Sequence, residues 1–132
     1  MCEVVNPDDP DDPVLRSLAD HTLMLYIEGN PAHTRMLVER FRRMPKPMYY
    51  QPRFLDAKWA EYKKERSIGE DCEVDPDGFA VWGFEQLLHH RVPLYQAIAR
   101  NFGYSVKMED IPAINSEAAF LNLVSHAIER HR

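Results

Sequence analysis

The chain has 132 residues, of which 45% are hydrophobic and 11% aromatic, and its formal net charge at pH 7 is −5. This length predicts one domain or a piece of one, and the composition supplies a hydrophobic core and argues against intrinsic disorder. No apolar run approaches the roughly 20 residues of a membrane span. The first residues, Met1–Pro7, lack the basic and apolar regions of a signal peptide. We therefore expect a cytoplasmic protein with no membrane partner.

The charged residues are grouped in blocks along the chain. The net charge is −6 for residues 1–31, +6 for 32–66, −6 for 67–90 and +1 for 91–132. An acidic protein with one basic block is a poor nucleic-acid binder, because the acidic blocks repel a phosphate backbone. We expect a small anionic ligand at the basic block or self-association between unlike blocks. The alternative is that the basic block is a solvated helical face.

No residue pattern predicts a metal site. Cys2 and Cys72 lack metal-ligand spacing, and two free thiols are favoured over a disulfide in a reducing compartment. Carboxylates near the N-terminus have the oxygen ligands that Mg²⁺ prefers, but a plain acidic loop is favoured for them. They are Asp8, Asp9, Asp11 and Asp12.

The first predicted elements are a short strand and a short helix. Residues 3–5 are predicted as the strand, within an acidic Asp/Pro loop region over residues 1–13. Asp12 followed by Pro13 is typical of a helix start, with an N-cap and a proline at the first helical position. The helix is expected to continue through Ala19.

A buried strand and a helix are predicted next. Residues 22–28 include a continuous apolar run without alternation, which is typical of a parallel strand covered on both faces. Asn30 and Pro31 then repeat the signal for a helix start, and this helix is expected to end near Met44. Strand, tight turn and helix together make half of a βαβ unit.

Residues 45–76 are interpreted as a lid-like insertion. Prolines interrupt its first part, and a helix with Phe54 and Trp59 at helical spacing follows. Asp77 is predicted to cap a further helix, which should end near Arg91 because Pro93 disfavours continuation.

The C-terminal part predicts a helix, a strand and a final helix. Pro93 is expected to begin a new helix that Gly103 closes in the left-handed conformation. Residues 104–108 alternate as a strand does, and Ser116 is predicted to cap the last helix. The expected fold is therefore α/β, a partial three-layer α/β/α arrangement of few parallel strands and five to six helices. It would be a single domain or domain fragment over residues 1–132.

The glycines exclude a self-sufficient P-loop enzyme. A phosphate cradle needs glycines at close spacing so that backbone N–H groups reach the phosphates. The chain has five glycines, and they form neither G-x-x-x-x-G-K-[ST] nor G-x-G-x-x-G.

The segment RVPLYQAIARNFGYSV and the final helix nevertheless resemble the C-terminal end of shikimate-kinase-like P-loop kinases. That family has Arg-x-Pro-Leu-Tyr there, followed by a helix, a strand and a last helix. The matching residues are Arg91, Pro93, Leu94 and Tyr95. The run TLMLYIE resembles the family's fourth strand, and Lys46–Met48 is similar to the Arg-Pro-Leu of its lid.

The resemblance implies two anion-binding groups. Arg91 would bind the anionic group of a small substrate, in the bidentate manner of a guanidinium group. Lys46, Arg42 and Arg43 would close over ATP phosphates as a lid and stabilise the transferred phosphoryl group. The alternatives are a local structural role for Arg91 and a solvated surface for the other three residues.

The departures from the family leave the function open. The P-loop strand is absent, PDDPDDP replaces a glycine-rich substrate loop, and about forty residues separate the lid from Arg91. One hypothesis is the C-terminal lid and substrate-side portion of a kinase-like or ATPase protein, not catalytically competent alone. ATP and Mg²⁺ are then expected only after a missing N-terminal half completes it. The alternative is a non-catalytic cytoplasmic module that self-associates or binds a protein partner.

Overall fold

The computed structural model describes residues 4–131, which form a mixed α/β fold that is mostly helical. These residues contain five α-helices, two short 3-10 helices and two strands. They divide into two compact units: residues 4–31 with 91–131 form unit 1, and Ala32–His90 form unit 2. The single domain expected over 1–132 stays a prediction, because this division does not show whether either unit folds alone.

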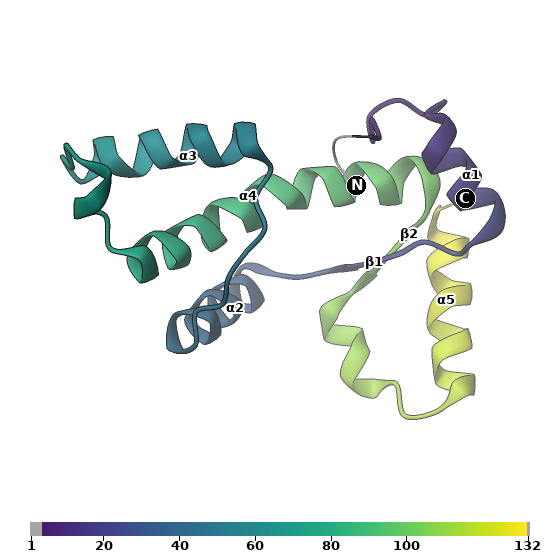
Figure 1. Cartoon of the computed structure of the whole chain (residues 1–132). Helices are drawn as coiled ribbons and strands as arrows, with labels where there is room; N and C mark the ends of the chain where they lie inside the picture. The colour runs from purple at the N-terminus through teal and green to yellow at the C-terminus, as the bar shows by residue number, and fades with distance from the viewer. Residues whose placement is uncertain (1–3, 132) are drawn as a thin grey trace. The chain divides into compact units, whose positions relative to one another are not determined.

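Unit 1 is built around a two-stranded parallel sheet. Strand β1 (Leu25–Glu28) pairs with β2 (Tyr104–Lys107), with Leu25 opposite Tyr104. Figure 1 shows the two strands side by side, with α5 near β2. The other elements of unit 1 are α1 (Pro13–His21), η2 (Met108–Ala113), α5 (Glu117–His131) and the second part of α4 (Pro76–Phe102).

Small and branched side chains form the core of unit 1. Leu15 of α1 and Val106 of β2 are 0% and 1% exposed, and Ala97 and Ala99 of α4 are buried. Gly103 joins α4 to β2 at a close approach, since a Cβ atom there would lie 2.5 Å from the backbone oxygen of Met24. The parallel pairing of the strands predicted at 22–28 and 104–108 is therefore confirmed, with shorter bounds.

Unit 2 has an aromatic core between two helices. It contains α2 (Pro31–Arg43, from Ala32), α3 (Pro52–Glu65), η1 (Asp71–Glu73) and the first part of α4. Tyr62 of α3 packs edge-on against Phe79 and Trp82 of α4, with ring centroids 5.3 and 5.2 Å apart. Figure 1 shows α3 alongside this part of α4. The lid-like insertion predicted over residues 45–76 therefore contains α3, whose aromatic residues belong to the core of unit 2.

The first strand predicted, at residues 3–5, is wrong where the structure describes it. Val4 lies in a turn and Val5 has no regular structure, while Glu3 lies outside the described residues. The backbone N–H of Asn6 donates to Oδ2 of Asp12 at 2.8 Å, so the chain folds back on the start of α1. This local bond competes with the extended backbone that a strand requires.

Two predictions about α4 are also wrong. The helix does not end near Arg91, because it continues to Phe102 with Pro93 inside it. Proline removes one hydrogen bond from a helix interior, and here the remaining bonds and the buried alanines hold the helix. Gly103 is not left-handed, since no described glycine has a positive φ.

No helix within residues 4–131 combines the length and the apolar character needed to cross a membrane.

Candidate functional site

The acidic N-terminal segment is held by pairs within the chain. Asp12 accepts hydrogen bonds from the backbone N–H groups of Val14 and Leu15 at 3.0 and 2.9 Å, as an N-cap does. Asp11 pairs with Arg16 at 2.8 Å, and Asp8 lies 3.5 Å from Arg100. The described residues contain no group of three or more His, Cys, Asp or Glu side chains arranged to hold a metal ion.

The predicted site residues belong to different units. Arg91 is half-buried on α4 in unit 1, whereas Lys46, Arg42 and Arg43 are exposed in unit 2. Lys46 lies between Pro45 and Pro47 in the chain that follows α2. One anion site built from both groups therefore stays a prediction, and each unit has a cavity of its own.

A groove of about 590 Å³ lies along one face of α2 in unit 2. We call it the α2 groove. Phe41 forms part of its floor and stacks on Phe84 of α4, with ring centroids 4.3 Å apart and an interplanar angle of 6°. The other lining residues are Met36, Leu37, Glu39, Arg40, Arg43, Met44 and Lys46.

The charges around the α2 groove are mostly positive. The carboxylate of Glu39 forms ion pairs with two guanidinium groups, those of Arg42 at 3.2 Å and Arg43 at 3.7 Å. Within residues 4–131, Arg40 and Lys46 have no ion pair with an acidic side chain. The groove thus has an apolar floor and two uncompensated cations on its rim.

Arg42 does not line this groove, although the sequence placed it in the lid with Arg43 and Lys46. Arg40 does, and sequence reasoning missed it. The sequence spacing could have identified Arg40. It lies four residues from both Met36 and Met44, and residues at this spacing share one face of a predicted helix. Phe84 carries no such signal, since its contact with Phe41 depends on tertiary packing.

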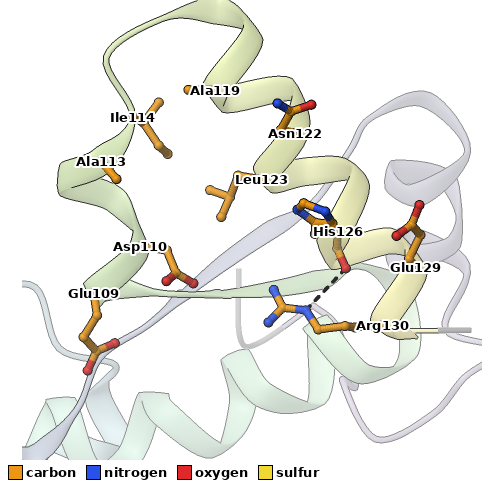
Figure 2. Close-up of a pocket in the computed structure, with 10 residues that line it drawn as sticks. All are labelled: Glu109, Asp110, Ala113, Ile114, Ala119, Asn122, Leu123, His126, Glu129 and Arg130. Atoms are coloured by element: carbon orange, nitrogen blue, oxygen red, sulfur yellow. Dashed lines mark hydrogen bonds between the residues drawn. The ribbon is translucent and has the colours of Figure 1, made fainter.

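Unit 1 has a separate open cavity of about 760 Å³ between η2 and α5. In Figure 2, Asp110 and Ile114 come from the η2 side, and Leu123, His126 and Arg130 come from α5. The Nε–H group of Arg130 donates to the backbone oxygen of His126 at 3.3 Å. This bond ties the Nε atom of Arg130 to its own helix.

Three groups with shifted pKa values lie outside both cavities. Hydrogen bonds from the backbone N–H groups of Asn6 and Leu15 lower the pKa of Asp12. A hydrogen bond from Lys63, and then one from Trp59, lower the pKa of Asp71. Burial, followed by the nearby charges of Glu28 and Tyr95, raises the pKa of Tyr26. These shifts follow from caps, ion pairs and packing.

Comparisons with known proteins give no match: no family model, no curated protein and no solved structure is similar to this chain. Neither cavity brings a nucleophile and a base into hydrogen-bonding contact among the described residues.

Proposed function

We propose that this chain is a non-catalytic interaction module that self-associates through the outer edge of β1, the edge that faces away from β2. One observation carries the proposal: β1 and β2 pair only with each other among the described residues. Parallel sheets are normally larger than two strands and covered on both faces. A cytoplasmic location belongs to the same proposal.

The backbone of β1 supports pairing with another strand. The N–H group of Tyr104 donates to the oxygen of Met24 at 3.0 Å, so Met24 directs its carbonyl group toward β2. The N–H and C=O groups of successive residues point alternately to the two edges of a strand. Those of Leu25 and Ile27 therefore point to the outer edge of β1. The side chains of Leu23 and Ile27 are 51% and 43% exposed, so apolar surface accompanies this edge.

A second copy of the chain fits this edge in an antiparallel register. Outward backbone groups must meet outward groups, and we propose the register that places Leu25 opposite Ile27 of the second copy. Tyr26 then lies opposite its own equivalent, and Glu28 opposite Met24 of the second copy. Aromatic and branched pairs stabilise neighbouring strands, and this register puts no like charges opposite each other. The interface is then a symmetric dimer, the commonest form of homo-oligomer.

Sedimentation velocity from low to high micromolar concentration tests this proposal. We expect the wild-type chain to shift from monomer to dimer as its concentration rises. Ile27→Pro removes one outward N–H group and leaves the hydrogen bonds between β1 and β2 in place. We expect it to raise the dimer dissociation constant about tenfold or more.

The matched control is Ile27→Val, which keeps both the N–H group and a branched side chain. It should dimerise like the wild type, and circular dichroism should show the same helical content for both variants. A chain that stays monomeric at every concentration would contradict the proposal, as would a dimer that Ile27→Pro leaves unchanged.

A second candidate function is the C-terminal, lid-bearing part of a P-loop kinase-like protein with a three-layer α/β/α fold. The parallel pairing of β1 with β2 through a helical crossover favours this candidate. The kinase family that RVPLY resembles has parallel strands at the corresponding positions. On this reading the outer edge of β1 takes a parallel strand from the missing N-terminal half. Arg91 would then bind the small anionic substrate, and Mg-ATP would bind only to the completed protein.

Calorimetry with Mg-ATP and the DNA upstream of Met1 test this second candidate. The isolated chain should release no heat of binding, because it lacks the glycines of a phosphate cradle. An in-frame G-x-x-x-x-G-K-[ST] upstream would support the candidate. A stop codon immediately before a ribosome-binding site would contradict it.

A further inference from the structure

We propose that the α2 groove binds a long-chain carboxylate, with its alkyl tail on the apolar floor and its carboxylate group at Arg40 and Lys46. The site lies wholly within unit 2 and does not depend on the self-association of β1. Its volume of about 590 Å³ falls in the range of roughly 300–1,000 Å³ that is usual for small-ligand sites.

The floor of the groove suits an alkyl chain. The stacked rings of Phe41 and Phe84 give it a fixed aromatic part. Met36 of α2 and Met44, which directly follows the helix, both line the groove and are 58% and 67% exposed, which leaves a large apolar surface in water. Methionine is flexible and polarisable, so it adapts to the varied shapes of a bound alkyl tail. Covering these side chains removes apolar area from water and stabilises the complex.

The rim of the groove suits a single negative charge. Arg40 and Lys46 have no acidic partner in the described part of the chain, so a ligand carboxylate competes with no existing ion pair. Arg43 contributes less, because Glu39 already lies 3.7 Å from its Nε atom. Glu39 also lines the groove, and its charge opposes ligands with several phosphate groups. A monocarboxylate with an apolar tail matches both parts of the site.

Methionine methyl NMR provides a direct test. The full chain, labelled with ¹³C at its methionine methyl groups, is titrated with sodium dodecanoate below the concentration at which micelles form. We expect the signals of Met36 and Met44 to shift and to saturate. Met24 and Met108 lie in unit 1 and serve as internal controls whose signals should stay in place.

Two other titrants separate the tail from the charge. Dodecanol has the tail without the carboxylate, and acetate has the carboxylate without the tail. We expect dodecanol to bind about tenfold more weakly than dodecanoate, since it loses the hydrogen bonds to charged groups. Acetate should cause no saturable shift. Equal binding of dodecanol and dodecanoate would overturn the proposal.

Charge variants at the rim of the groove complete the test. The double variant Arg40→Gln, Lys46→Gln should weaken dodecanoate binding about tenfold. The matched control is Arg42→Gln, which removes a neighbouring arginine that pairs with Glu39 and does not line the groove. It should bind like the wild type. The proposal fails if both variants weaken binding equally, if Met24 and Met108 shift together with the groove signals, or if no methionine signal shifts.

Discussion

Gly103 shows how a single residue sets the geometry of unit 1. It lies between α4 and β2 and is buried, and its φ is not in the left-handed region. The reason for glycine is the space around it: a Cβ atom would lie 2.5 Å from the oxygen of Met24 and 3.0 Å from its Cβ. This close approach lets the N–H group of Tyr104 bond to Met24 and begin the pairing of the two strands.

Gly103→Ala should therefore destabilise the chain strongly. Because the clash involves backbone, we expect a loss of about 2–3 kcal/mol in the free energy of unfolding. Urea unfolding followed by circular dichroism measures it. Gly69→Ala is the control, since a Cβ atom there meets only Glu73 Oε2 at 3.8 Å, and it should change stability by less than about 0.5 kcal/mol. Equal losses from the two variants would show that the contact with Met24 is not the cause.

At the scale of elements, prolines and caps decide where the helices begin. Pro13, Pro31 and Pro52 each occupy the first position of a helix, where the missing N–H group costs nothing. The end of α3 is less usual. Ser67 follows it with a φ of 55°, and the N–H group of Ile68 bonds to the oxygen of Lys63 at 2.9 Å. A serine therefore occupies the left-handed position that glycine usually fills.

Ser67→Gly should stabilise the chain by up to about 1 kcal/mol, because glycine adopts a positive φ without the Cβ clash. Ser67→Val should destabilise it, since a branched residue tolerates this conformation poorly. Thermal unfolding of the two variants provides the measurement. If both lower the melting temperature, the left-handed conformation at this position is not what limits stability.

At the scale of the whole molecule, acidic pH should unfold the chain partly through two carboxylates. The pKa values of Asp12 and Asp71 are lower in the folded chain than the ordinary 3.8. Below that value the unfolded state binds more protons than the folded state. Their contribution to stability is therefore complete above about pH 4 and is lost as the pH falls through the lowered folded pKa values.

The double variant Asp12→Asn, Asp71→Asn should flatten the acid side of the stability profile. Asparagine remains a good N-cap, so the change removes the titration while it keeps the cap of α1. Urea unfolding at a series of pH values from neutral to strongly acidic measures the slope. A variant whose stability falls as steeply as that of the wild type would show that other carboxylates control acid unfolding.

The basic block illustrates how far a candidate site can be predicted from the sequence. Charge counting located it, and Arg43 and Lys46 do line a cavity. Arg42 does not line the groove, although it lies 3.2 Å from Glu39, which does. The aromatic floor depends on Phe84, which is more than forty residues away in the chain and reaches Phe41 only through packing.

The cap predicted at Asp77 is wrong, because α4 begins at Pro76 and the carboxylate of Asp75 accepts from the N–H group of Gly78. The sequence by itself determined the parallel pair of strands, the caps of α1 and α5 at Asp12 and Ser116, and the lack of the glycine spacing of a phosphate cradle. These features follow from local chemistry: apolar runs, prolines with capping residues, and glycine spacing. Only the tertiary structure decided that α4 continues through Pro93 and that Val4–Val5 form no strand. Local sequence preferences for a helix end or a strand amount to a few kcal/mol at most. Packing outweighs the preference at Pro93, and the hydrogen bond from Asn6 to Asp12 outweighs the one at Val4–Val5.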